Sequence, residues 1–160
     1  MNIFKDKDEL EKGDVIQEVE ESKVSKDVAI TEFERILKAA RVKWWKLEKT
    51  SGKADTEALK IEIVDAIMDG RITVNDQGFP TIHTDNESEK LQNISILCRP
   101  IRAHRLAADR INSDFEEKAK DTIIADYLSV GNTKYSASEL SLLEEGDYNI
   151  LDWLWSLFLA

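Results

Sequence analysis

The feature that most constrains this chain is its last segment, residues 150–160, which reads ILDWLWSLFLA. Nine of these eleven residues are apolar, and on a helix they would spread around most of the circumference. A helix that is apolar on all sides has to be buried on several of them. Any fold of this chain must therefore give this segment a deep apolar environment.

Two interpretations of this segment are open. The terminal helix of a small domain usually packs one side against its own core, which predicts that its other side meets another chain. Exposed Trp and Phe side chains often anchor such interfaces, because each removes a large apolar area from water. The predicted partner-binding residues are Trp153, Leu154, Trp155, Leu157, Phe158 and Leu159. In the second interpretation, the helix fills a groove in its own domain and stacks on Trp44 and Trp45.

Length and charge limit the number of domains and the kinds of partner that this chain can have. Its 160 residues are about one domain. The net charge of −10 is unevenly distributed along the chain. Residues 1–27 carry nine acids and five lysines, and residues 135–160 carry five acids and no base. The middle of the chain is nearly neutral. We predict an acidic arm over residues 1–27 and a single globular domain over residues 28–160. Nucleic acids and anionic membranes bind clustered Lys and Arg, so the charge argues against both partners.

Helical periodicity dominates the first half of the predicted domain. Thr31 and Glu34 have the spacing of a capping box, which predicts a helix over residues 31–47. Its buried stripe would contain Phe33, Ile36, Leu37, Ala40 and Trp44, with Trp45 off the stripe. A second helix is predicted from Asp55, as its N-cap, to Gly70, as its end.

The segment RITVNDQGFPTIHT, residues 71–84, indicates a β-hairpin. Ile72 and Val74 alternate with polar residues, and turn residues separate them from a second extended run. Alternation resumes over residues 92–98, which predicts a third strand. The resulting sheet would have one apolar face, and helices must cover it.

Further helical segments are expected after the sheet. They are predicted over residues 101–112, over residues 114–130, after a capping box formed by Ser136 and Glu139, and from Asp147 as the N-cap of the last helix. The predicted fold is α+β and mostly helical, with about five helices and a small antiparallel sheet formed by a hairpin near residues 71–84 and a strand near residues 92–98.

Residues able to carry catalysis are few. His83 lies in a predicted edge strand and His104 lies near two arginines, so both are interpreted as solvated surface residues rather than catalytic bases. Cys98, the single cysteine, is interpreted as a small core residue. The six glycines are isolated, and two histidines with one distant cysteine do not make a zinc site. We therefore predict no catalytic, cofactor or metal site.

Four arginines surround the helix predicted over residues 101–112. They are Arg99, Arg102, Arg105 and Arg110. One interpretation is a solvated helix face, and the other is a docking face for an acidic partner or for the acidic tail of this same chain.

The order of several segments resembles the tail assembly chaperones of long-tailed bacteriophages. The similar segments are ITEFERILKAARV, DTEALKIEIVDAIMDGRITVNDQGFPTI, ISILCRPIRAHRLAADRI and SLLEEGDYNILDWLWSLFLA. They contain an early helix, a helix leading into a GRITVNxxGxP hairpin, a strand ending in Arg-Pro, and a closing aromatic helix. The resemblance covers residues 30–160 and leaves the acidic arm unexplained.

This resemblance implies a non-catalytic protein that acts in the cytoplasm of the infected host. Such chaperones bind the long tape measure protein, keep it soluble, and release it as tail tube protein polymerises. They often self-associate, so a homo-oligomer is expected. The acidic ends of this chain agree with such a role, because like charge opposes premature aggregation.

Two other function classes are kept as alternatives. An acidic phage-encoded inhibitor of a host DNA-binding enzyme would display ordered rows of carboxylates, whereas the middle of this chain is nearly neutral. A small enzyme using Asp and Glu would need a cleft with carboxylates of shifted pKa.

Overall fold

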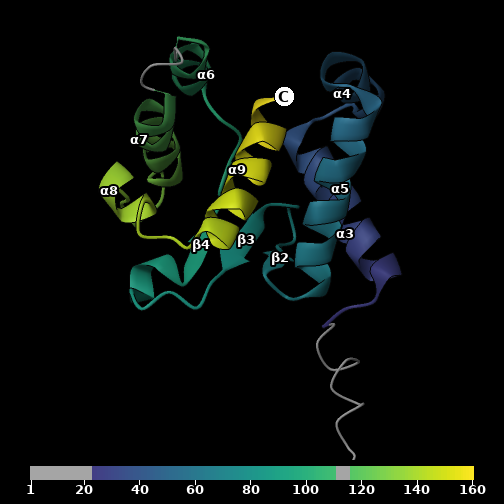
Figure 1. Cartoon of the computed structure of the whole chain (residues 1–160), viewed down its shortest axis with the longest axis horizontal. Coiled ribbons are helices and arrows are strands. Elements are labelled where there is room, and N and C mark those ends of the chain that lie inside the picture. The colour runs from purple at the N-terminus through teal and green to yellow at the C-terminus, as the bar shows by residue number, and fades with distance from the viewer. Residues whose placement is uncertain (1–22, 111–115) are drawn as a thin grey trace, which may run out of the picture.

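The computed structural model describes the backbone of residues 23–110 and 116–160. Within these ranges the fold is mostly helical α+β, with seven α-helices and a three-stranded antiparallel sheet, which confirms the predicted fold class (Figure 1). The helices are α3 (Lys26–Ala40), α4 (Trp44–Ser51), α5 (Lys53–Met68), α6 (Arg102–Asp109), α7 (Glu116–Leu128), α8 (Ala137–Leu140) and α9 (Glu145–Leu159). The strands are β2 (Ile72–Val74), β3 (Pro80–His83) and β4 (Asn93–Ser95), and the 3-10 helix η2 (Glu89–Leu91) precedes β4.

The helix predicted over residues 31–47 is two helices in the structure. Ser25 caps α3, because its side chain accepts the N–H of Val28, so the helix begins before Thr31. Thr31 lies inside α3, and the prediction of a capping box there was wrong. Arg41 ends α3 in the left-handed region with φ of 60°. This break redirects the chain, and α4 then packs on α5 rather than continuing the line of α3.

The folded part begins before residue 28. Lys23 and Val24 both donate their N–H groups to the carbonyl of Met68 at the end of α5, at 2.7 and 3.3 Å. Residues 23–27 are therefore attached to the domain, whereas the rest of the predicted arm, residues 1–22, lies outside the described residues.

The predicted hairpin is present, with β2 and β3 paired antiparallel. The Asn75 carboxamide oxygen accepts the N–H groups of Gln77 and Phe79, each at 2.9 Å, and so fixes the turn. Gly78 has φ of 92°, and a Cβ there would lie 2.6 Å from the carbonyl oxygen of Arg35 in α3. The turn therefore needs glycine both for its conformation and for the close approach of α3.

The sheet has one apolar and one polar face, as predicted. Ile72, Ile82 and Ile94 stand in register across the three strands and are at most 1% exposed. On the other face, Thr81 shares a 2.7 Å hydrogen bond with Ser95. β4 ends at Ser95 rather than near residue 98, because the next residue of β3 is Pro80, whose carbonyl accepts the N–H of Ile96 but whose nitrogen has no proton to donate.

α9 runs through the middle of the molecule (Figure 1). It lies between a group formed by α3, α4 and α5 and a group formed by α6, α7 and α8, with the sheet near its start. Arg71, next to the start of β2, pairs with Asp147 at 2.6 Å, and Lys120 of α7 pairs with Asp152 at 2.7 Å, so ion pairs bind α9 to the start of the sheet and to α7.

Two helix starts near the end of the chain had been predicted from their caps. The capping box of Ser136 and Glu139 is confirmed at the start of α8. α9 begins after Glu144, and Asp147 lies in its first turn rather than at the cap, so that prediction was wrong. The carboxylate of Asp147 binds a guanidinium from the start of the sheet instead of the helix backbone.

Candidate functional site

The structure buries most of the predicted partner-binding residues. Leu154, Leu157 and Phe158 are 0% exposed and Trp155 is 3% exposed. Trp153 and Leu159 are partly exposed and pack against the same core. In the folded domain these four side chains are enclosed, so of the predicted set only Trp153 and Leu159 reach the surface. Partner binding by this set stays a prediction.

These side chains are enclosed because α9 has more than one side against its own domain. Phe158 stacks on Phe79 with ring centroids 5.8 Å apart, and Trp155 packs on Tyr127 of α7 with centroids 5.1 Å apart. The interpretation in which the helix fills a groove in its own domain is therefore confirmed for these rings. The partners are Phe79 and Tyr127, not the two tryptophans of α4.

Arg105 explains part of the arginine cluster around α6. Its guanidinium donates to the carbonyl oxygens of Leu159 and Phe158, at 2.8 and 3.1 Å. Carbonyls at the end of a helix lack intrahelical partners, so this cation satisfies them and complements the helix dipole. One arginine of the cluster thus binds the end of this same chain, and its partners there are backbone carbonyls rather than carboxylates.

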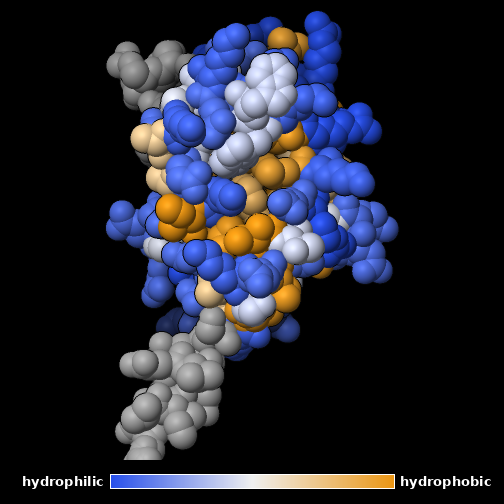
Figure 2. Space-filling model, turned by 90° about the vertical axis from the view of Figure 1, so that its right-hand side faces the viewer, coloured by the Kyte–Doolittle hydropathy of each residue, from blue (hydrophilic) through white to orange (hydrophobic). Residues whose placement is uncertain are grey.

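A different surface carries exposed apolar side chains. Figure 2 looks onto the side formed by α3, α4 and α5 and shows apolar side chains gathered near its centre, with polar side chains around them. On these helices Trp45 is 63%, Ile61 50% and Val28 49% exposed. Partly buried apolar residues of the same helices are Ile30, Leu37, Trp44, Leu47, Leu59 and Met68. We use the name helical face for the exposed apolar side chains of α3, α4 and α5, which are Val28, Trp45 and Ile61.

The adjacent tryptophans of α4 have different environments. Trp44 meets Phe33 of α3 edge to face, with centroids 5.6 Å apart and an interplanar angle of 87°. Consecutive helical residues are about 100° apart around the axis, so Trp45 cannot share that contact. Its exposure confirms that it lies off the buried stripe. An exposed Trp of this kind is the residue type that most often anchors protein interfaces.

Trp45 lies beside a hollow of about 420 Å³, which we call the α4 groove. Its lining residues are Arg41, Val42, Lys43, Trp45, Lys46, Leu47, Thr50 and Ala160. Apolar and cationic side chains are mixed in this lining. The groove therefore suits a polypeptide segment that presents apolar residues together with carboxylates.

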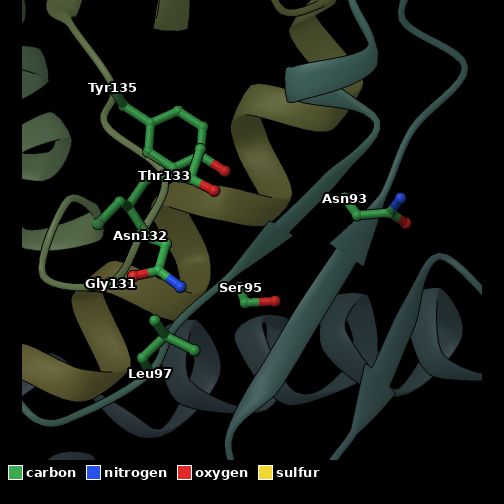
Figure 3. Close-up of a pocket in the computed structure, with 8 residues that line it drawn as sticks. Asn93, Ser95, Leu97, Gly131, Asn132, Thr133 and Tyr135 are labelled. Carbon is green, nitrogen blue, oxygen red and sulfur yellow. The ribbon is translucent and has the colours of Figure 1, made fainter.

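Figure 3 shows a smaller hollow, of about 190 Å³, between β4 and the segment of residues 131–135. Its polar side chains are amides and hydroxyls, from Asn93, Ser95, Asn132, Thr133 and Tyr135. Burial, and secondarily the Glu139 carboxylate, raise the pKa of Tyr135, so its hydroxyl stays protonated at neutral pH. This lining offers hydrogen bonds but does not place a base beside a nucleophile.

A third hollow, of about 600 Å³, gathers ionisable side chains near the start of α9. It is lined by Lys23, Asp69, Gly70, Arg71, His83, Thr84, Asp85, Glu144, Gly146 and Asp147. Asp147, which is 7% exposed, is already paired with Arg71. The ring nitrogens of His83 lie 2.7 Å from the Thr73 hydroxyl and 2.6 Å from the Asn93 amide oxygen. In this hollow the fold thus uses Arg71, Asp147 and His83 for its own contacts.

Both histidines differ from their predicted environments. His83 is half-buried in β3, which is the central strand rather than an edge strand. His104 is 8% exposed and packs edge-on against Tyr127, with centroids 5.6 Å apart, because α6 lies against α7. The prediction of a solvated surface residue was therefore wrong for His104, whereas His83 remains partly exposed.

Cys98 packs against the core while remaining partly exposed. Burial raises the pKa of its thiol, which disfavours the reactive thiolate. This environment agrees with the interpretation of Cys98 as a small packing residue.

Sequence reasoning missed the helical face and the α4 groove. The available signal was the segment KAARVKWWKLEKTSGK, residues 38–53, which has six basic residues and one acid. Counting charge over the whole middle of the chain averaged this segment with its acidic neighbours. A shorter window, together with the off-stripe Trp45, would have indicated a basic aromatic surface.

Metal ligands and membrane spans were searched over residues 23–110 and 116–160. No group of three or more His, Cys, Asp or Glu side chains is placed there to hold a metal ion. Helices long and apolar enough to cross a bilayer are likewise absent from these ranges. Comparison of the chain with protein-family models, curated proteins and solved structures found no match.

Proposed function

We propose that this protein is a non-catalytic tail assembly chaperone of a long-tailed bacteriophage. It binds the tape measure protein and keeps it soluble in the host cytoplasm until tail tube protein polymerises around it. The order of motifs over residues 30–160 supports this family. The structural observation that carries the proposal is the helical face, on which Trp45 and Ile61 are 63% and 50% exposed.

The helical face suits reversible holding of another polypeptide. Trp45 exposes 63% of its side chain, or roughly 150 Å² if the whole side chain has about 250 Å². Covering that area contributes at most about 4 kcal/mol at ~25 cal/mol per Å². Much of this is offset by the cost of ordering both partners. Several contacts of this size hold an apolar helix, yet allow its release during assembly.

Self-association belongs to the same proposal. An exposed apolar surface on α3, α4 and α5 can pair with a second copy of itself when no tape measure protein is present. A two-fold dimer would bring the same residues of both copies together. Binding of the tape measure protein would then compete with the homo-oligomer.

Co-expression with the tape measure protein of the same phage tests the proposal. The double variant Trp45→Ser with Ile61→Ser removes the two most exposed residues of the helical face. Leu142→Ser is the matched control, because Leu142 is 64% exposed but lies between α8 and α9. The soluble fraction of tape measure protein should rise with the wild type and with the control, and should fall with the double variant.

Two results would contradict the proposal. A tape measure protein that stays equally insoluble with and without the wild-type chain would remove the function itself. Equal activity of the wild type and the double variant would remove the helical face as the binding surface. Circular dichroism of each variant verifies that a loss of binding does not come from unfolding.

A further inference from the structure

The α4 groove lies within a strongly basic part of an acidic protein. Residues 38–53 carry Lys38, Arg41, Lys43, Lys46, Lys49 and Lys53 against a single acid, Glu48, in a chain of net charge −10. All six basic side chains are exposed. The ion pairs found within the described residues use other cations, among them Arg71, Lys90 and Lys120. The surface around the groove therefore has a net positive charge.

The sequence contains a segment of opposite charge and suitable apolar content. Residues 1–22 carry eight acids and three lysines, for a net charge of −5. The same segment contains Ile3, Phe4, Leu10, Val15, Ile16 and Val19. Residues 38–53 have a net charge of +5 and contain Trp45 and Leu47, which line the groove. The two segments thus match in charge and in apolar residues.

We propose that residues 1–22 bind the α4 groove of the same chain. Their carboxylates lie against the basic side chains of residues 38–53, and their apolar side chains cover Trp45. This contact shields the exposed tryptophan of the helical face. The inference does not depend on the identity of the partner proposed above.

The attachment point of the arm permits this contact. Lys23 is held by the carbonyl of Met68 at the end of α5, whereas α4 ends next to the start of α5. α5 has 16 residues and is about 24 Å long at 1.5 Å per residue. An extended arm of 22 residues reaches roughly 75 Å. Tethering also raises the effective concentration to the order of mM, so modest attraction is sufficient.

Zero-length carbodiimide cross-linking of the full chain at low salt tests the proposal. This reagent joins a carboxylate to an amine only where the two are in contact, and mass spectrometry then locates the bond. We expect carboxylates of residues 1–22 to be joined to Lys43, Lys46 or Lys49 several-fold more often than to Lys134. Lys134 is the internal control, because it is exposed but lies beyond α7. Links as frequent at Lys134 would overturn the proposal.

Isotope mixing separates a contact within one chain from a contact between chains. Unlabelled and ¹⁵N-labelled protein are mixed before cross-linking, and links should join peptides of the same label. Links that join different labels in the proportion of a random mixture would show exchange between copies and would overturn the proposal for the same chain.

Acrylamide quenching of Trp45 gives an independent readout. The signal of this residue is obtained as the difference between wild type and Trp45→Phe. Replacing Glu18, Glu20 and Glu21 by Gln in the full chain should raise the quenching of Trp45 several-fold, as should high salt, since screening weakens exposed ion pairs. Quenching of Trp45 that is already maximal in the wild type, and unchanged by either treatment, would refute coverage by the arm.

Discussion

Replacing Trp155 by Ala tests whether the aromatic end of the chain belongs to the core. Trp155 is 3% exposed and contacts Tyr127, so nearly all of its roughly 250 Å² is removed from water. At ~25 cal/mol per Å² this is about 6 kcal/mol, an upper value because unfolded chains already bury part of their surface. Measured Trp-to-Ala losses in cores are about 3–5 kcal/mol. We expect a loss of about 4 kcal/mol, a large fraction of a typical stability of about 5–15 kcal/mol.

Urea unfolding followed by far-UV circular dichroism measures this loss, because the signal comes mainly from the helices. Leu142→Ala is the control, since Leu142 is 64% exposed and surface substitutions usually change stability by about 0.5 kcal/mol or less. The assignment of α9 to the core would be refuted if the two variants lost equal stability, or if Trp155→Ala lost less than about 1 kcal/mol.

Three further perturbations test particular contacts. Gly78→Ala should destabilise the fold by about 2–4 kcal/mol in urea unfolding. Gly52→Ala should cost less, because both glycines have φ near 92° but only at Gly78 would the added Cβ lie 2.6 Å from a backbone oxygen. Arg105→Met should lower stability by about 1–3 kcal/mol, because two carbonyls at the end of α9 lose a charged donor. The hydrogen bond from Lys90 holds the pKa of Glu139 below its ordinary value. The pair therefore stabilises the fold at pH values above the ordinary pKa of Glu, and this stabilisation is lost as the pH falls through the lower pKa of Glu139 in the folded state. An NMR titration of the Glu139 carboxyl should show that Lys90→Met raises this pKa.

The β-hairpin shows where sequence reasoning succeeded. Its turn is closed by the side chain of Asn75 and by a glycine three residues later, which are local features visible in the sequence. The alternation of Ile72 with polar neighbours then decides which face of the sheet is buried. Local turn chemistry and a period of two residues thus suffice for this part of the fold.

The helix predicted over residues 31–47 shows a limit of the same reasoning. Its periodicity continues across Arg41, so the pattern alone does not reveal the left-handed residue at that position. The break exists because α4 gains contacts with α5. Such a break depends on a helix that is later in the chain, and local propensity does not include that helix.

The sequence by itself determined the class of fold, the hairpin, the second capping box and the requirement that residues 150–160 be buried. Each of these follows from hydrogen bonds and periodicity within a few neighbouring residues. Only the tertiary structure decided what buries that last segment: α9 lies between two groups of helices, so Trp155 and Phe158 are enclosed while Trp45 remains exposed. The physical reason is that apolar burial has no direction of its own. A pattern indicates which side chains must leave water, and the packing of distant elements selects the surface that receives them.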